Sequence, residues 1–316
     1  MPEPIKWIRT VVIAAEDVGA SVRQLTLADP DGWELPPFTP GAHIDVLIGD
    51  SMVRTYSLVN PPHENTRYTI GVKREPHGRG GSRILHDHVA IGDELGVSLP
   101  RGGWNIDQFS MFRLVAGGIG LTPMLSVVSS LRHIGCENIS LHVITRNATL
   151  YQAALAPLVH RGLAVVHDTS MRPRPDLADL VADERPETLA ACCGPPAMLD
   201  AFERATMGWD EEHTHVERFT APRPPVDDAQ HAYVAVLADS SRQVDVPAGV
   251  SLLAALRAAG ADVPSSCEGG VCGACRVGWM DGEPVHRDYV LSATEQQHWL
   301  LSCVSGCRTD KLVLDL

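Results

Sequence analysis

Four of the eight cysteines have a spacing that suits iron–sulfur chemistry. Cys267, Cys272 and Cys275 form a C-x4-C-x2-C pattern, and Cys303 follows after 27 intervening residues. This spacing is typical of plant-type [2Fe–2S] clusters, in which each iron takes two thiolates. Small residues such as Gly269 let the backbone approach inorganic sulfide and donate N–H hydrogen bonds to sulfur. We therefore expect Cys267, Cys272, Cys275 and Cys303 to be the metal ligands.

A four-cysteine zinc knuckle is the alternative for the same residues. Zinc modules usually pair their cysteines in C-x2-C steps, whereas the first gap here is four residues. Five cysteines fall in the last fifty residues, and such clustering in an intracellular chain indicates metal rather than disulfides. The fifth is Cys307, which we interpret as a bystander thiol.

Two glycine-rich turns suit a dinucleotide. Gly117-Gly118-Ile119-Gly120-Leu121-Thr122-Pro123 follows an apolar run and has the form G-x-G-x-x-P. Glycines permit a tight turn close to a pyrophosphate, and the helix start that follows offers free N–H groups and suits proline. Cys193-Gly194-Pro195 also ends a predicted strand, so both turns are expected at one edge of a parallel sheet. We expect nicotinamide binding by Gly117, Gly118, Gly120, Thr122, Pro123, Cys193, Gly194 and Pro195.

A cation follows the second predicted strand of the same region. Thr145 and Arg146 stand where side chains reach an adenosine ribose, so we include Arg146 in the nicotinamide site. An arginine there would favour the 2′-phosphate of NADPH, but it is equally consistent with an ordinary surface residue. These residues alone leave the choice of nicotinamide open.

A strand and a helix start in the first third of the chain suit a flavin. Arg54-Thr55-Tyr56-Ser57 lies on a predicted strand, and Gly80-Gly81-Ser82 opens a predicted helix. Arginine and a helix start suit a phosphate, an aromatic ring can lie on an isoalloxazine face, and a hydroxyl can hydrogen-bond a flavin nitrogen. Either pattern alone is common. Their order with the later motifs favours a flavin site at Arg54, Thr55, Tyr56, Ser57, Gly80, Gly81 and Ser82.

Three stretches of the chain with different sequence patterns predict three domains. Residues 1–105 contain short apolar runs separated by turn residues, as in an antiparallel β-barrel. Residues 106–221 alternate strand and helix, as in a parallel sheet flanked by helices. A proline-rich linker, 222–230, precedes the cysteine-bearing residues 231–316. The expected strands of the first two domains are Ile5–Ile13, Val22–Leu27, His43–Ile48, Val53–Val59, Tyr68–Lys73, Leu95–Leu99, Phe112–Ala116, Ile139–Thr145, Leu163–Asp168 and Leu189–Cys193.

Composition limits the partners. With 316 residues, 44% hydrophobic and 21% charged, the chain is typical of a soluble multidomain protein. No apolar run reaches the roughly 18 residues of a membrane helix, and the N-terminus is not typical of a signal peptide. A net charge of −13 would repel nucleic acid. We therefore expect a cytoplasmic protein without nucleic-acid or membrane partners, whose acidic surface either steers a basic protein or serves solubility.

In this order, the motifs resemble the phthalate dioxygenase reductase and vanillate demethylase reductase family of the ferredoxin–NAD(P)+ reductase superfamily, over essentially the whole chain. The resemblance implies an antiparallel flavin-binding β-barrel, a parallel-sheet α/β nicotinamide-binding domain and a C-terminal β-grasp ferredoxin domain. It also implies FMN and NADH; the group with an N-terminal ferredoxin domain uses FAD instead. It assigns the FMN phosphate to Arg54, Gly81 and Ser82, and the ring to Tyr56 and Ser57. Phe219 matches an aromatic near flavin and nicotinamide.

The number of electrons that each redox group handles predicts the order of electron transfer. NADH gives two electrons as hydride and a [2Fe–2S] cluster takes one, so a flavin that handles both must lie between them. We expect an NADH-dependent oxidoreductase, the monomeric reductase component of a bacterial two-component, Rieske-type oxygenase. Its protein acceptor would be the terminal oxygenase, and Ser57 would polarise flavin N5.

Two alternatives remain open at this point. One is a redox-sensing protein whose cluster regulates partner binding without turnover, and the nicotinamide turns argue against it. The other is a flavin reductase whose chemistry ends at the flavin, which the appended cluster disfavours. A steady-state cytochrome c reduction assay separates the sensing protein from the enzyme.

Overall fold

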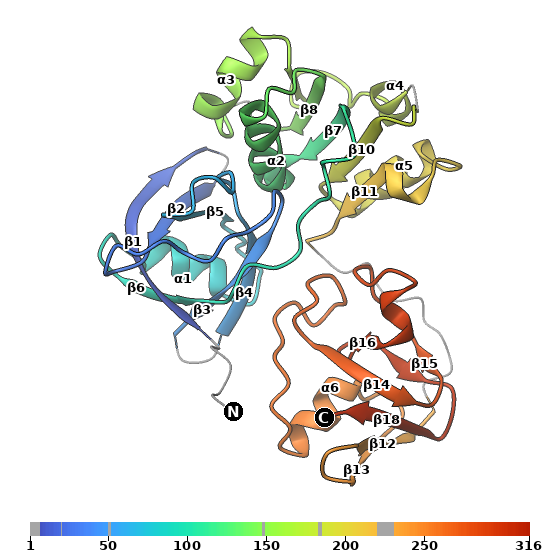
Figure 1. Cartoon of the computed structure of the whole chain (residues 1–316). Helices are drawn as coiled ribbons and strands as arrows, with labels where there is room; N and C mark the ends of the chain where they lie inside the picture. The colour runs from blue at the N-terminus through green and yellow to red at the C-terminus, as the bar shows by residue number, and fades with distance from the viewer. Residues whose placement is uncertain (1–6, 20, 50–51, 147–148, 183–184, 220–230) are drawn as a thin grey trace. The chain divides into compact units, whose positions relative to one another are not determined.

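The computed structural model describes residues 7–19, 21–49, 52–146, 149–182, 185–219 and 231–316. It forms two compact units, the first ending at Glu217 and the second beginning at Arg218 (Figure 1). The predicted linker, residues 222–230, lies outside the described residues. None of the described helices is long and apolar enough to span a membrane.

The first unit begins with the predicted antiparallel barrel. Its strands are β1 (Ile8–Asp17), β2 (Val22–Ala28), β3 (His43–Ile48), β4 (Met52–Ser57), β5 (Tyr68–Lys73) and β6 (Glu94–Val97), in the order β4-β3-β6-β1-β2-β5. A bridge between Leu58 and Ile70 brings the two ends of the sheet together, so the barrel is nearly closed. Helix α1 (Gly81–Asp87) buries Leu85 in the barrel core, whose inward positions are apolar.

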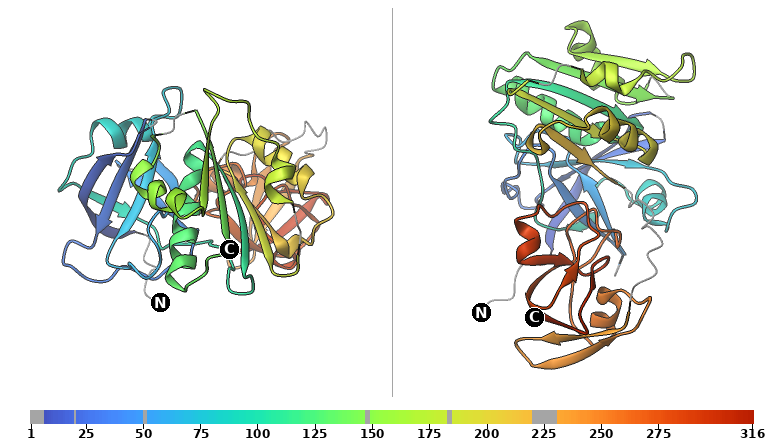
Figure 2. Two further views of the ribbon diagram at one scale, coloured as in Figure 1. Left: turned by 90° about the horizontal axis from the view of Figure 1, so that it is seen from above. Right: turned by 90° about the vertical axis from the view of Figure 1, so that its right-hand side faces the viewer.

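The same unit continues with the predicted parallel sheet. Strands β7 (Met111–Gly117), β8 (Ile139–Thr145), β9 (Ala164–Asp168), β10 (Thr188–Cys193) and β11 (Thr214–Glu217) have the order β11-β10-β7-β8-β9. Helices α2 (Leu121–His133) and α3 (Gln152–His160) pack on one face, and α4 (Leu177–Val181) and α5 (Pro196–Ala205) on the other (Figure 2). The short turns η1 (Gly118–Gly120) and η2 (Glu211–His213) precede α2 and β11. The chain leaves β7 toward β8 and later returns to its other side at β10, which makes the end of β7 a topological switch point.

Polar contacts join the barrel to the parallel sheet. Ser126 Oγ on α2 donates to the carbonyl of Asn60, at 2.9 Å. The N–H of Tyr151, just before α3, donates to the carbonyl of Val18 at 2.9 Å. Gly71 on β5 lies so close to Thr122 and Tyr151 that any Cβ there would collide with both. The barrel that carries the flavin motifs and the sheet that carries the nicotinamide turns are therefore packed together in one compact unit.

The second unit is a mixed sheet crossed by one helix. Strands β12 (Tyr233–Leu237), β13 (Arg242–Val246), β14 (Arg276–Asp281), β16 (Trp299–Leu301) and β18 (Lys311–Asp315) have the order β13-β12-β18-β14-β16. Helix α6 (Leu252–Ala258) buries Leu252, Leu253 and Leu256 against it. A small ladder pairs β15 (Pro284–Val285) with β17 (Gly306–Cys307), and η3 (Glu295–Gln297) precedes β16. The cysteine loop, residues 267–275, runs from the helix side into β14.

Candidate functional site

The four predicted ligand cysteines lie together as two hydrogen-bonded pairs, Cys267 with Cys272 and Cys275 with Cys303. The hydrogen bond from the Cys272 thiol lowers the pKa of Cys267 to about 5, against the opposing effect of burial. The Cys303 thiol lowers the pKa of Cys275 in the same way. Thiolate is the form that binds metal, so each pair presents a ready ligand.

This pairing distinguishes the two metals considered. Two separate sulfur pairs match the two irons of a [2Fe–2S] cluster, each of which takes two thiolates. The donor set therefore fits the cluster better than one tetrahedral zinc.

The backbone of the cysteine loop is shaped for close approach to sulfur. Gly269 N–H donates to Cys267 Sγ at 3.3 Å. Glu268 and Gly270 have positive φ angles of 54° and 75°. A Cβ on Gly270 would lie 2.8 Å from Cγ2 of Val304, the residue after Cys303. The glycine thus lets the two ligand segments pack directly on each other.

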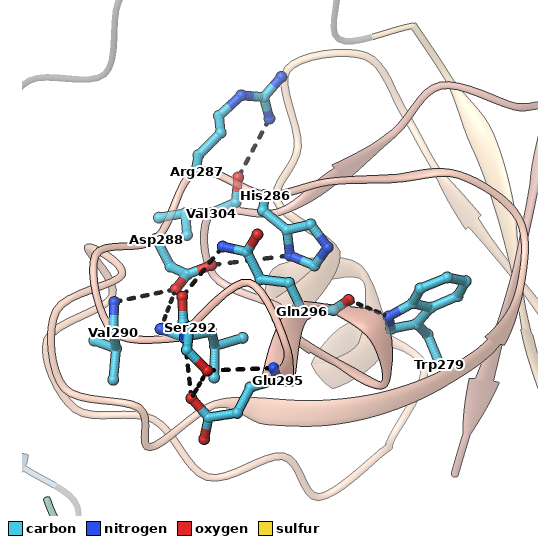
Figure 3. A network of polar contacts seen from close by, with 10 residues as sticks. Trp279, His286, Arg287, Asp288, Val290, Ser292, Glu295, Gln296 and Val304 are labelled. Atoms are coloured by element: carbon cyan, nitrogen blue, oxygen red, sulfur yellow. Dashed lines mark hydrogen bonds and ion pairs between the residues drawn. The ribbon is translucent and has the colours of Figure 1, made fainter. Parts of the chain in front are cut away.

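A third segment, residues 287–291, contacts both ligand segments, and Figure 3 shows its Arg287 bonded to Val304 and the network around Asp288. Tyr289 N–H donates to the Gly270 carbonyl at 3.0 Å, and Arg287 Nη1 donates to the Val304 carbonyl at 3.2 Å. Between them, Oδ1 of the fully buried Asp288 side chain accepts the N–H groups of Val290 and Leu291, at 3.1 and 2.8 Å. One buried carboxylate therefore fixes the turn whose neighbours hold the cysteine loop in place.

Cys307 has other partners. It lies buried on β17, where its Sγ is 3.2 Å from Thr309 Oγ1 and 3.6 Å from the Lys311 carbonyl. It also lies near enough to Tyr233, in the core of the second unit, to affect the pKa of that phenol. These contacts are those of a packed core thiol.

The two predicted nicotinamide turns touch each other at the carboxyl edge of the parallel sheet. Ala116 and Cys193 are paired in register on β7 and β10. The Cα of Gly117 is 3.1 Å from where a Cβ on Gly194 would stand, and a Cβ on Gly117 would be 2.6 Å from Cδ of Pro195. Any Cβ on Gly120 would collide with the Cys193 carbonyl. The glycines are therefore needed for the two turns to meet.

Within the first turn, the residues divide into two kinds. Gly118 has a φ of 55°, and nothing lies within 4 Å of where its Cβ would be, so space is open above it. Thr122 and Pro123 are buried in the first turn of α2, and Thr122 Oγ1 donates to the Ile119 carbonyl at 2.9 Å. Gly118 thus offers an approach to a ligand, while Thr122 shapes the turn.

The predicted ribose contact is accompanied by a carboxylate that the sequence did not suggest. Arg146 is exposed directly after β8, and Thr145, at the end of that strand, is paired with Asp168 at the end of β9. Hydrogen bonds from the Ser170 hydroxyl and N–H lower the pKa of Asp168. A negative charge therefore stands in register with Thr145, the residue before Arg146, at neutral pH.

The predicted flavin residues gather on β4 and the start of α1. A Cβ on Gly81 would be 2.9 Å from Arg54 Cγ, so this glycine lets α1 begin against the arginine. Gly80 has a φ of 95°, and Ser82 Oγ accepts the Glu75 N–H at 3.1 Å. Burial raises the pKa of Tyr56, and the Arg54 guanidinium opposes this, which places the two side chains near each other.

The other two residues of that strand have different partners. Thr55 Oγ1 donates to Asp45 Oδ1 at 2.6 Å, and Asp45 pairs with Arg101 at 2.6 Å, so Thr55 belongs to a network of the barrel wall. Ser57 Oγ donates to Oε1 of Glu217 at 3.0 Å. Trp104 Nε1 donates to Oε2 of the same carboxyl at 3.3 Å. The structure therefore brings together three residues from β4, β11 and the loop before β7.

Glu217 is the main functional candidate absent from the sequence prediction. Although the residue is partly exposed, protein atoms surround its carboxyl group, and this burial raises the pKa to about 7 against the two hydrogen bonds. Perturbed carboxyls of this kind mark functional sites. The only signal in the sequence was its place two residues before Phe219. Phe219 itself is 41% exposed and belongs to the second unit.

Comparisons with known proteins agree with this geometry. Residues 236–308 match the 2Fe-2S iron-sulfur cluster binding domain family. The chain is 36% identical to the phthalate dioxygenase reductase of Burkholderia cepacia, over 100% of this chain and 99% of the relative. A solved structure of phthalate dioxygenase reductase, described as a modular structure for electron transfer from pyridine nucleotides to [2Fe-2S], superposes with a TM-score of 0.72 and 36% identity, covering 98% of both chains. An intact type IV self-sufficient cytochrome P450 monooxygenase gives a TM-score of 0.89 and 34% identity, over 100% of this chain and 43% of that one.

Proposed function

Since this chain belongs to the phthalate dioxygenase reductase family and is an oxidoreductase of that kind, we propose that it is the reductase component of a two-component, Rieske-type oxygenase. Electrons would pass from NADH through FMN to the [2Fe–2S] cluster and on to the terminal oxygenase. The observation that carries this proposal is the arrangement of the four ligand cysteines as two pairs, Cys267 with Cys272 and Cys275 with Cys303. They lie in a chain whose first unit joins an antiparallel barrel to a parallel sheet. FMN and a cluster would supply the step from hydride to single electrons.

We assign a domain to each group. FMN would be bound by residues 1–105, NADH by 106–221 and the cluster by 231–316, with 222–230 as the linker. Cys267 with Cys272 would hold one iron, and Cys275 with Cys303 the other. Cys307 would take no part, because its sulfur already contacts Thr309 and Lys311.

The nicotinamide dinucleotide would lie across the two touching turns at the end of β7. The open space above Gly118 and the N–H groups at the start of α2 suit a pyrophosphate. Gly117, Gly120, Gly194 and Pro195 would act by allowing the turns to meet, and Thr122, Pro123 and Cys193 by fixing their shape. These residues bind and orient, and none needs to act as acid or base.

The flavin would lie along β4. Arg54 would pair with its phosphate, and Gly80, Gly81 and Ser82 would bring the start of α1 alongside. Tyr56 would cover the ring and Ser57 would bond N5, while Thr55 would hold the strand through Asp45. Phe219 would cover the nicotinamide side, as the family resemblance implies. Ser57 and Glu217 together would hold one proton at this end of the ring.

NADH rather than NADPH is favoured by the carboxylate of Asp168 at the end of β9. A carboxylate at the end of a neighbouring strand suits a ribose 2′-hydroxyl and repels a 2′-phosphate. Asp168 occupies such a place, in register with Thr145. We therefore propose that Asp168 outweighs the single exposed arginine.

A second class of oxygenase is a candidate for the protein that accepts the electrons. A chain of the same fold is joined to a cytochrome P450 in the self-sufficient monooxygenase, over the full length of the present chain. A heme monooxygenase is therefore the alternative to a Rieske-type partner. Reconstitution of substrate oxidation with each class of oxygenase, the reductase acting as a monomer, would decide between them.

Cofactor analysis of the purified protein tests the proposal. We expect one FMN, two irons and two acid-labile sulfides per chain, together with NADH-dependent reduction of cytochrome c. Zinc without labile sulfide would refute the cluster. FAD in the extract would refute the choice of flavin, and cofactor-loaded protein without reductase activity would favour a sensing role.

A further inference from the structure

Glu217 is held by two neutral donors from distant parts of the first unit. Ser57 Oγ donates to its Oε1 at 3.0 Å and Trp104 Nε1 donates to its Oε2 at 3.3 Å. The second donor has no role in the function proposed so far.

The position of the Trp104 indole is fixed independently of Glu217. Its backbone N–H donates to the Pro40 carbonyl at 2.8 Å. Gly41, with a φ of 77°, leaves room for the ring, since a Cβ there would lie 2.7 Å from Nε1. The ring lies 4.4 Å from that of His215, centroid to centroid, and the residue is only 5% exposed. The donor is therefore preorganised rather than drawn in by the carboxyl.

Trp104 also separates two hollows in the surface of the unit. One cavity of about 340 Å³ is lined by Trp104, His215 and Glu212 among others. Another of about 490 Å³ is lined by Trp104, His63 and His133. Because the indole is a wall of both and contacts Glu217, its removal would open the Glu217 side of the site to water.

We propose that Trp104 is a positioning residue for the flavin half of the site, whose N–H holds Oε2 of Glu217 so that Oε1 stays on Ser57, and whose ring keeps water from the carboxyl. The proposal rests on the proposed function, in which Ser57 hydrogen-bonds the flavin.

The groups that face Glu217 make the two effects of Trp104 separable. They are Ser57 on β4, Trp104 on the loop before β7 and Cys193 on β10, with His215 two residues earlier on β11 and packed against Trp104. Burial raises the pKa of Cys193 and lowers the pKa of His215 to about 4, so both are neutral near pH 7. Burial then raises the pKa of Glu217 while the hydrogen bonds lower it. Loss of the N–H should raise this pKa, and entry of water should lower it.

Two substitutions at Trp104 test this with opposite expected signs. Trp104→Phe keeps the ring and removes the donor, so the pKa of Glu217 should rise by about one pH unit. Trp104→Ala admits water, so the pKa should fall. The pKa is read from the carboxyl stretching band in an infrared pH titration of the resting protein, with the band identified by its loss in Glu217→Gln. Trp33→Phe, at an exposed tryptophan, is the matched control and should shift nothing.

A second readout links Trp104 to the flavin. The pH midpoint of NADH-driven flavin reduction should move with the infrared pKa in each Trp104 variant, and Trp104→Phe should have no such effect in a Glu217→Gln background. Equal infrared midpoints in wild type and Trp104→Phe, or shifts of the same sign in both variants, would overturn the role of Trp104. Wild-type protein that fails to reduce flavin with NADH would overturn the proposed function instead, because the infrared titration needs no turnover.

Discussion

The cluster site and the flavin site are encoded in opposite ways. Three of the four cluster ligands fall within nine residues of sequence, and their spacing alone predicts the chemistry. The flavin side is assembled from Ser57, Trp104 and Glu217, and the hydrogen bond from Ser57 to Glu217 spans 160 residues. A site whose ligands are close in sequence is visible before folding, whereas one built across three segments appears only with the fold.

The two sites also differ in what supports them. The cysteine loop is held by the Tyr289 N–H and the segment after Cys303 by the Arg287 side chain, both from one short turn fixed by the buried Asp288 side chain. The flavin side is held by side chains that reach across the junction of barrel and sheet. We therefore expect substitutions to disable the two sites separately, and the following predictions test that separation from the largest expected effect to the smallest.

The largest effect is expected at a cluster ligand. Cys272→Ser should abolish electron transfer to cytochrome c while flavin reduction by NADH continues at the wild-type rate, because the cluster lies downstream of the flavin. Stopped-flow and steady-state assays measure the two steps. Cys307→Ala is the control and should leave both steps nearly unchanged, since its thiol contacts Thr309 and Lys311 and lies apart from the two cysteine pairs. Loss of flavin reduction in a folded Cys272→Ser protein would contradict the separation.

A pH-dependent stability change is expected at Glu217. Its pKa is raised from 4.5 to about 7, so the native state takes up a proton in this range and the ionised carboxyl is destabilising above it. Glu217→Gln should therefore raise the free energy of unfolding at pH 8 by about 2 kcal/mol, less than the full linkage value because the residue is partly exposed. At pH 4, where the acid is protonated in both states, the difference should vanish. Denaturant unfolding at both pH values checks this, and an equal change at each would argue against a raised pKa.

The turn fixed by Asp288 predicts a smaller effect on cluster retention. Asp288→Ala removes the acceptor for two N–H groups, one exposed and one partly buried, and should destabilise the second unit by about 1 kcal/mol, since water can replace part of the loss. Asp288→Asn keeps an oxygen for those groups and should lose much less. Cluster absorbance followed during thermal unfolding separates the two, with Asp281→Ala, on β14, as an outward-facing control. If the Asn variant lost its cluster as fast as the Ala variant, the charge rather than the hydrogen bonds would be responsible.

The smallest effect concerns the choice of nicotinamide. Arg146→Ala should lower residual NADPH activity more than NADH activity, and Asp168→Asn should raise NADPH activity, each about two- to fivefold because Arg146 is exposed and Asp168 is at most partly buried. The ratio of kcat/KM for the two nucleotides is the measurement. A wild-type preference for NADPH would show that Arg146, or another cation, forms a true phosphate site.

Regular patterns in the sequence were sufficient for the fold. The antiparallel barrel, the parallel sheet and the C-terminal cluster domain are all confirmed, because alternating apolar positions and glycine or proline turns determine them locally. Strand β11 escaped prediction because it has four residues, all partly buried, and so lacks an apolar pattern. The role of Glu217, on the same strand, was not predicted either, since nothing near it in sequence indicates that its carboxyl contacts Trp104 and Ser57.

The glycine-rich turns show an intermediate case. Their composition predicts a dinucleotide edge, but only the fold shows that Gly120 and Gly194 are needed because the turns touch. Asp168 was missed for a similar reason, because its closeness to Thr145 depends on the pairing of β8 with β9. Residues that act through tertiary contacts are not marked by local spacing.

The order of electron transfer is tested most directly by removing the flavin. Flavin-stripped protein that retains its cluster should leave the cluster oxidised when NADH is added without oxygen, as read by electron paramagnetic resonance. Addition of FMN should restore cluster reduction. A cluster that NADH reduces at the same rate without flavin would contradict the proposed path from the nicotinamide site through the Ser57 side of the barrel to the paired cysteines.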